Sequence, residues 1–497
     1  MGVEAMSRSV EVARAEVQRA FTCALELAEA DQRRRFWEFE TELWSLLLAL
    51  GRALISLYLV RQSLRPRPAA YSQAGLRFAL DGERTSALGT RCGKVDFTRP
   101  VGRRVGHPTA AADLPVDREL GLCAGFSVGV VMAITRLCAQ MAFVPARSTF
   151  RYFHGWSPSS RAVLRMVDTV GGEVRPFLEN LPAPKDDGSV LVLEGDGGGA
   201  PMMSRLEYAR RARRREKRRR GTRRNARRAR RRSLKRERRG KGEKSKNAKV
   251  AFVGVIYTLR KTPQGYEGPI NKRVYATFES HEALFIWLLR EATKRGYGRR
   301  RCLFIADGSE HIWRLQTEYF PLAEACLDWY HVVEKLWVAG TSLFPEGSAA
   351  LKAWVGRQKK YLRRGRIHAL LRDLIAAYRS IPKTGPGNKG KRDRLAAVVG
   401  HLFHQRHRMP YHVLRDQDLI IGSGAIEGAV RNLVRMRLDG PGMRWGRGRA
   451  ECVLLLRCIL LNGLWEELSQ HVATSGVRLA AAPVPAEPYE ARPRMAA

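Results

Sequence analysis

Two short apolar runs, each followed by an aspartate, constrain the fold of this chain more than any other feature of its sequence. Val190-Leu-Val-Leu-Glu194 precedes Gly-Asp196, and Cys302-Leu-Phe-Ile-Ala306 precedes Asp307. Apolar runs of about five residues are typical of strands buried on both faces, and open α/β sheets bind ligands at the carboxyl ends of such strands. The pattern predicts an α/β fold with both aspartates at one sheet edge, although Asp-Gly alone is also an ordinary turn signal.

The sequence around these runs predicts the rest of a mixed sheet and a helical insertion. Further strands are expected at 249–259, 273–278 and 325–327, helices at 281–295 and 424–438, and a basic helical stretch over 336–411. The short strand ends at Asp328, and the helix 424–438 carries Glu427.

Six short motifs follow one another along the chain: E-G-D-G at 194–197, F-I-A-D-G at 304–308, D-W-Y-H at 328–331, S-G-A-I-E-G at 423–428, P-G-M-R-W at 441–445 and N-G-L-W at 462–465. In this order they resemble the motifs of the ISKra-type insertion-sequence transposases, DDE enzymes related to the Mutator-like group. The resemblance covers about 88–465. The Mutator-like relatives often carry Cys where this chain has Asp328, and the basic segment after Asp196 is foreign to the pattern.

The resemblance implies an RNase H-like mixed sheet with an all-helical insertion, preceded by a mainly helical N-terminal DNA-binding region. It implies a bacterial transposase that binds element ends, cleaves phosphodiesters and transfers strands. Asp196, Asp307 and Glu427 would hold two Mg²⁺ or Mn²⁺ ions, which prefer carboxylate oxygens. Asp328 and His331 would support catalysis; the alternative is that Asp328 only caps a helix.

The helix that carries Glu427 has two distinct faces. Its apolar stripe consists of Ile426, Val430, Leu433, Val434 and Leu438. Glu427, Arg431 and Arg435 share another face at helical spacing, so the carboxylate can face metal while the arginines hold DNA phosphate. The alternative is an exposed Glu-Arg ladder. Downstream, Arg444 and Trp445 are also expected at the DNA, although Trp445 is equally suited to packing.

The charge of the chain points to a polyanionic partner. Its 497 residues include 89 Lys+Arg and 48 Asp+Glu, a net charge of +41, far more than solubility requires. Residues 205–249 alone hold 25 Lys/Arg and four Glu, so we expect a disordered segment that binds the DNA backbone, or RNA. A solvated loop without a role is the alternative.

The N-terminal part contains three successive predicted helices, at 127–141, 145–154 and 158–170. Pro158 suits a first helical position, and Gly171-Gly172 is expected to end the last helix. The triplet is a candidate helix-turn-helix in which Arg161 and Arg165 reach a major groove. A plain helical packing module is the alternative.

These patterns divide the chain into six regions. They are a helical region 1–87, a hairpin and helix-turn-helix region 88–180, the first part of the catalytic core 188–335 with a basic insertion 203–248, a helical insertion 336–418, the C-terminal core helices 419–470 and a disordered tail 471–497.

The remaining features concern location and rival functions. The eight cysteines form no C-x-x-C pair and no secretory signal is evident, so we expect a cytoplasmic protein. The apolar window 43–60 is interrupted by Arg52, so we expect a buried helix there and no membrane contact. We also expect a homo-oligomer on DNA.

The rival functions are those of a metal-dependent nuclease without strand transfer and of a non-catalytic nucleic-acid-binding protein. A tyrosine recombinase is disfavoured because the last tyrosine, Tyr489, lies in the tail.

Overall fold

The computed structural model divides into two compact units. It describes residues 3–30, 33–107, 109–204, 248–477 and 479, together with 207, 209–211, 213 and 214. The first unit comprises Met1–Phe177 and Leu464–Pro485, and the second comprises Leu178–Gly463 and Ala486–Ala497. The disorder predicted for the basic segment and for the tail beyond 479 therefore concerns residues that lie largely outside the described ones.

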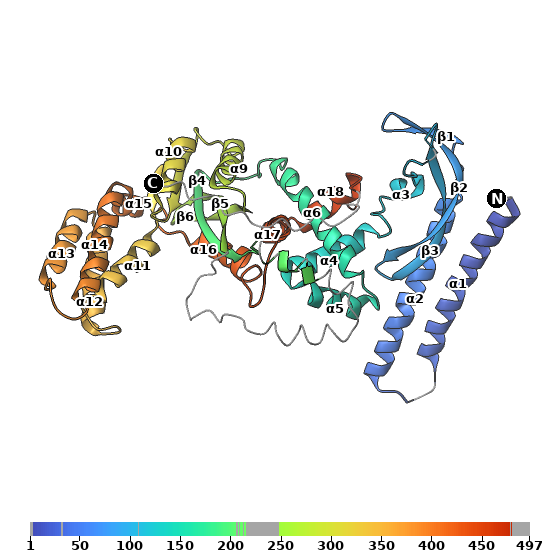
Figure 1. Ribbon diagram of the computed structural model, residues 1–497, viewed down its shortest axis with the longest axis horizontal. Helices are drawn as coiled ribbons and strands as arrows, with labels where there is room; N and C mark the ends of the chain where they lie inside the picture. Colours follow the sequence, from blue (N-terminus) through green and yellow to red (C-terminus); the bar gives the residue numbers. More distant parts are fainter. Residues whose placement is uncertain are drawn as a thin grey trace. The chain divides into compact units, whose positions relative to one another are not determined.

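The first unit begins with a pair of long helices, α1 (Val3–Glu29) and α2 (Phe36–Ser63), which pack together (Figure 1). The prediction of a buried helix over 43–60 is wrong, because only Ala53 and Leu59 of α2 are buried. α1 and the strand β3 (Gly93–Arg104) cover one part of its surface and leave large apolar side chains exposed. Among the described helices, α2 alone is long and apolar enough to cross a membrane, and 11% of its most apolar window is buried.

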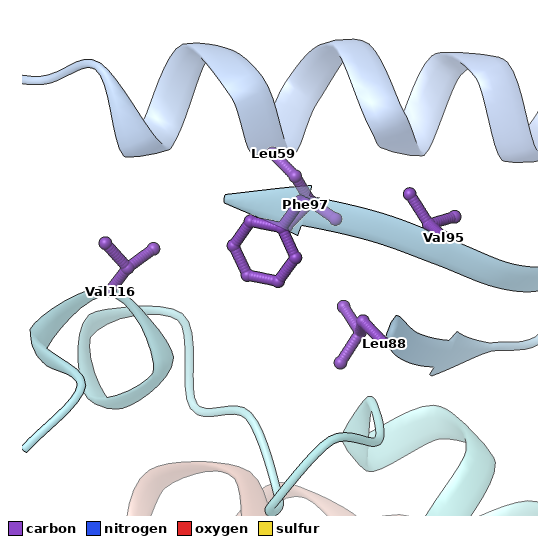
Figure 2. Packing of buried hydrophobic residues seen from close by; sticks show 5 residues of the cluster. All are labelled: Leu59, Leu88, Val95, Phe97 and Val116. Atoms are coloured by element: carbon purple, nitrogen blue, oxygen red, sulfur yellow. The ribbon is translucent and has the colours of Figure 1, made fainter. Parts of the chain in front are cut away.

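A three-stranded antiparallel sheet follows, formed by β1 (Ala70–Gln73), β2 (Leu76–Thr90) and β3 (Gly93–Arg104) in that order. The predicted hairpin is present but begins at Leu76, so the expected boundary between residues 87 and 88 falls inside β2. Figure 2 shows the small core that joins α2, this hairpin and α3 (Pro115–Glu119). Its residues are Leu59, Leu88, Val95, Phe97 and Val116.

The three helices predicted next are observed as α4 (Val128–Gln140), α5 (Phe143–His154) and α6 (Ser160–Glu179). α6 does not end at Gly171-Gly172 as expected, since burial of Val170 and Val174 outweighs a cost of about 1 kcal/mol for each helical glycine. Its cap is Ser159, whose hydroxyl accepts from Ala162 N. The first unit also includes α18 (Trp465–Thr474), which packs on α4, so the predicted disordered tail starts too early.

The second unit is built on a mixed five-stranded sheet of order β6-β5-β4-β7-β8, which confirms the mixed α/β class. The strands are β4 (Val190–Pro201), β5 (Ala248–Thr262), β6 (Gly265–Thr277), β7 (Arg301–Ala306) and β8 (Glu324–Leu327). β5 runs antiparallel to β4 and β6, whereas β7 runs parallel to β4 and β8. Leu191, Val192, Leu303 and Phe304 are fully buried, as expected of central strands.

β4 continues past Asp196, where the sequence predicts its end. Its parallel pairing with β7 stops at Gly195↔Ala306, but its antiparallel pairing with β5 extends to Pro201↔Ala248. Asp196 therefore lies where the parallel part of the sheet ends, within a longer strand. Glycines 197–199 extend the strand because their backbone groups pair with β5.

Helices complete the second unit. α9 (His281–Lys294) packs on β5 and β6, while α10 (Glu310–Tyr319) follows β7 and α11 (Trp329–Gly340) follows β8. The expected insertion contains α12 (Ala349–Arg363), α13 (Ile367–Ser380), α14 (Asn388–Gln405), the short 3₁₀ turn η1 (Arg406–Arg408) and α15 (Tyr411–Asp416). Figure 1 shows α11 to α15 gathered in one lobe beside the sheet.

The C-terminal helices of this unit differ from the sequence prediction at two points. The helix expected over 424–438 is divided into α16 (Gly424–Val430) and a π-helical turn, η2 (Arg431–Arg435). The predicted region of C-terminal core helices, 419–470, contains α17 (Arg447–Leu461) but also the start of α18, which belongs to the first unit, and Gly463, with a left-handed φ of 70°, separates the two helices.

Candidate active site

Asp196 lies on β4, and Asp307 directly follows the neighbouring strand β7. Each follows directly on the last parallel pair, Gly195↔Ala306. Asp196 accepts a hydrogen bond from Gly197 N at 2.6 Å, and Asp307 accepts one from Ser309 N at 3.0 Å. Burial raises the pKa of Asp196, and the negative charge of Asp307 raises it further. The structure thus brings together two half-buried carboxylates, as the strand pattern predicts.

α16 crosses the same face of β4. Ile426 N donates to Glu194 Oε2 at 2.7 Å, and a Cβ atom built on Gly198 would lie 3.0 Å from Val434 Cβ. Alternate residues of a strand share one face, so Asp196 lies between the contact of Glu194 with α16 and the contact of Gly198 with Val434 of the π-helical turn η2. Glu427 follows Ile426 directly and has an exposed side chain.

The carboxylates suit a hard divalent cation in part. Mg²⁺ and Mn²⁺ take carboxylate oxygens, and two adjacent carboxylates call for positive charge between them. Asp196 and Asp307 meet this requirement. Within the described residues, however, no three His, Cys, Asp or Glu side chains are arranged to hold one ion, so Glu427 has to turn toward the aspartates to complete such a site.

The predicted two-faced character of the Glu427 helix is confirmed. The five residues of the apolar stripe are buried, and Glu427, Arg431 and Arg435 are exposed. Arg435 is close enough to Asp196 to lower the pKa of that carboxyl, against the larger effect of burial. The sequence gives no sign of the π-helical turn, in which Met436 N donates to Arg431 O at 3.0 Å.

Arg457 of α17 stabilises this turn through hydrogen bonds to its backbone. Its guanidinium donates to Leu433 O at 3.1 Å and also to Asn432 O. A π-helical turn leaves carbonyl groups without their usual α-helical partners, and such turns occur often at functional sites. Arg457 therefore holds the unusual backbone that presents Arg431 and Arg435.

Asp328 is a buried helix cap with a second contact. Its Oδ2 accepts from His331 N at 2.9 Å, as the capping alternative requires, and its Oδ1 accepts from Ser423 N at 2.8 Å. The carboxylate thus links the start of α11 to the residue before α16. The His331 ring lies beside that of His401, with 5.4 Å between the ring centroids.

Two residues of the helical insertion reach the loop after Asp307. A Cβ atom on Gly308 would lie 1.9 Å from His401 Cε1, and Gln405 Nε2 lies 3.4 Å from Gly308 O. Sequence reasoning missed His401, because nothing in the sequence links a helix of the insertion to a loop more than ninety residues earlier.

A second histidine pair lies near the same aspartate. The rings of His281 and His311 are 4.6 Å apart. Burial, together with the charge of His311, lowers the pKa of His281 to about 4, while Asp307 acts in the opposite direction. Histidines of four helices, α9, α10, α11 and α14, therefore lie around the loop of Asp307. Of these four residues, the sequence analysis predicted only His331.

Glu194 is a further functional candidate that the sequence analysis did not single out. It is fully buried, and its Oε1 accepts from Tyr257 Oη at 2.6 Å. Burial raises its pKa to about 7, against the lowering effect of its two hydrogen bonds. The signal that could have identified it is an acidic residue at the end of an otherwise apolar run.

The other predicted DNA contacts differ in accessibility. Trp445 is 6% exposed and donates from Nε1 to Leu438 O at 2.8 Å, so the structure gives it the packing role that the sequence left open. Arg444 is partly exposed, with Glu207 at 3.8 Å. In the first unit, Arg161 is exposed and Arg165 half-buried on α6.

Comparisons with known proteins add little to this geometry. No protein-family model and no curated protein matches the sequence. Among solved structures, a Drosophila P element transposase strand transfer complex is similar at 11% identity and a TM-score of 0.25, over 71% of this chain and 82% of that chain. A TM-score this low does not define a common fold, and the comparisons assign the chain to no family.

Proposed function

We propose that this chain is a DDE-type DNA transposase of a bacterial insertion sequence, which binds the element's ends and catalyses cleavage and strand transfer. The observation that carries the proposal is the pairing of two carboxylates, Asp196 and Asp307, that are far apart in the sequence. Asp196 and Asp307 directly follow the last parallel pair of β4 and β7, and Glu427 adjoins Ile426, the residue of α16 that contacts Glu194 on β4. A five-stranded mixed sheet with a helical insertion before α16 is also what an RNase H-like domain requires.

Asp196, Asp307 and Glu427 are the residues that would hold two Mg²⁺ or Mn²⁺ ions. Such ions would activate the attacking oxygen and stabilise the leaving 3′ oxygen of a phosphodiester. The attacking oxygen belongs to water in cleavage and to a DNA 3′-hydroxyl in joining, so no covalent protein intermediate is required.

The chain's other residues bind and orient the DNA. Arg431 and Arg435 are exposed on the Glu427 side of η2, where they can hold the phosphates beside the scissile bond, and Arg444 extends this surface. His331 lies on the first turn of α11 beside His401 and can contact the scissile phosphate. Positioning and neutralisation of phosphate charge then supply most of the acceleration.

The first unit is proposed to recognise the element's ends through α6, with Arg161 and Arg165 in the major groove. The basic residues 205–249 add contacts to the DNA backbone or to RNA, in proportion to their charge. We further propose that the protein acts in the cytoplasm, as a homo-oligomer assembled on DNA.

One assay separates the three functions that the site and charge allow. The purified protein is incubated with Mg²⁺ or Mn²⁺, a labelled duplex from the DNA flanking its gene and an unlabelled target plasmid. A transposase cleaves at the element's end and joins it to the plasmid. Cleavage without joining indicates a nuclease, and binding without cleavage indicates a non-catalytic protein; either result contradicts the proposal.

A further inference from the structure

Glu194 is an acidic residue in the interior of the second unit that no step of the proposed reaction uses. It is 0% exposed, and it shares with Asp196 the face of β4 that α16 covers. A buried carboxylate is costly unless hydrogen-bond donors surround it. Its partners therefore indicate what it does.

Both oxygens of Glu194 accept hydrogen bonds from other elements. Tyr257 Oη of β5 donates to Oε1 at 2.6 Å, and Ile426 N of α16 donates to Oε2 at 2.7 Å. The phenol is itself buried, at 3% exposure. The carboxylate thus connects β4 and β5 to the backbone N–H of Ile426, the residue directly before Glu427.

The start of α16 depends on such external contacts. Gly422, Gly424 and Gly428 surround it, and glycine restricts the backbone less than any other residue. Two side chains hold this segment from outside: Asp328 accepts from Ser423 N, and Glu194 accepts from Ile426 N. Of these two hydrogen bonds, the one from Ile426 N to Glu194 lies nearer to Glu427 in the sequence.

We propose that Glu194 is a positioning residue, which fixes the first turn of α16 so that Glu427 reaches the metal site beside Asp196. The metal-binding part of this inference rests on the proposed function of Glu427. Glu194 itself is no ligand, because both of its oxygens are occupied and it is shielded from solvent. Tyr257 orients Glu194 and acts on α16 only through it.

Three variants test the proposal in the full-length protein. Glu194→Ala removes the acceptor of Ile426 N–H. Glu194→Gln keeps a carbonyl for that N–H, while its amide can donate to Tyr257 Oη. Glu291→Ala is the matched control, since Glu291 is also a buried acid but pairs with Arg273 and Arg295, away from α16.

The first measurement is hydrogen–deuterium exchange of a peptide that spans residues 423–431, which requires no activity. Exchange should rise in Glu194→Ala, and stay near wild type in Glu194→Gln and Glu291→Ala. Unchanged exchange in a folded Glu194→Ala protein overturns the proposal. So does an equal rise in Glu291→Ala, which would mean that general destabilisation causes the effect. If Glu194→Ala does not fold, exchange in Glu194→Gln and Tyr257→Phe decides: the first must resemble wild type and the second must rise.

The second measurement is the Mn²⁺ concentration that gives half-maximal cleavage of end DNA. Loss of a residue that orients a ligand typically weakens metal binding about 10- to 100-fold, so Glu194→Ala should shift this concentration by that factor, and Glu194→Gln by much less. Normal metal dependence together with raised exchange would contradict the link to Glu427. If the wild type cleaves nothing, the proposed function fails, while the exchange experiment still decides whether Glu194 positions α16.

Discussion

The ring of His401 occupies the space that a side chain on Gly308 would need: a Cβ atom at residue 308 would lie 1.9 Å from His401 Cε1 and 2.6 Å from Nε2. Gly308 follows Asp307 directly, whereas His401 belongs to α14 of the helical insertion. The insertion therefore packs directly on the loop that orients one of the two paired aspartates.

Gly308→Ala should weaken both stability and activity. Either the ring of His401 or the Asp307 loop has to move, which typically costs about 1–3 kcal/mol of unfolding free energy. Chemical denaturation and the cleavage assay measure the two effects. Gly356→Ala is the control, because nothing lies within 4 Å of its added Cβ atom; it should stabilise α12 by up to about 1 kcal/mol. If His401→Ala does not partly restore the Gly308→Ala protein, the clash is not the cause.

Acid should destabilise the protein partly through His281. Its pKa is lowered to about 4, chiefly by burial. A depressed pKa means that the unfolded chain takes up the proton first, so this stability is present above about pH 6.5 and is lost as the pH falls toward 4. Because the ring is partly exposed, the loss should be roughly 1–2 kcal/mol. The difference in unfolding free energy between pH 7 and pH 5 should be smaller for His281→Gln than for wild type. For the control His368→Gln, at an exposed position, this difference should equal that of wild type.

Replacement of Arg161 or Arg165 by Ala should reduce the preference for end DNA over scrambled DNA. A side chain that reads a base edge contributes about 1–3 kcal/mol of discrimination. Competition binding with the full-length protein measures it. Arg103→Ala removes the same charge from an exposed position of β3 paired with Asp81, and should leave the preference unchanged. An equal loss in Arg103→Ala would indicate an effect of net charge only.

Deletion of residues 215–246, bridged by a short Gly/Ser linker, should weaken binding to all DNA sequences alike. These residues carry 19 Lys/Arg and three Glu. The deletion spares Met203, whose N–H donates to Trp445 O at 2.9 Å. The slope of log affinity against log salt should become shallower by roughly 0.9 for each duplex phosphate that the protein no longer binds. An unchanged slope would exclude phosphate binding, and weaker binding of one sequence alone would mean that the segment reads bases.

The sequence predicts the elements that have strong local signals. The runs before Asp196 and Asp307, the apolar stripe of the Glu427 helix and the helical insertion are all present, because continuous burial and helical periodicity are written in neighbouring residues. It also predicts that the two aspartates share one sheet edge, whereas the direct pairing of the strands that precede them, β4 and β7, is visible only in the structure.

The features that the sequence does not predict depend on distant packing. Burial of Val174 carries α6 through two glycines that normally end a helix, and Arg457 stabilises a π-helical turn that no local pattern reveals. Glu194 and His401 act through contacts with residues 232 and 93 positions away, respectively. α2 has the apolar composition of a core helix, yet the first unit buries little of it.

Metal-dependent cleavage of element-end DNA decides whether the proposed active site is correct. It is measured, beside DNA affinity, for wild type and for Asp196→Asn, Asp307→Asn and Glu427→Gln. Each substitution removes one carboxylate but none of the phosphate-binding arginines. Cleavage with Mg²⁺ or Mn²⁺ should therefore fall about 100-fold or more, while affinity stays within a few-fold of wild type. Near-normal cleavage by either aspartate variant would contradict the proposed site.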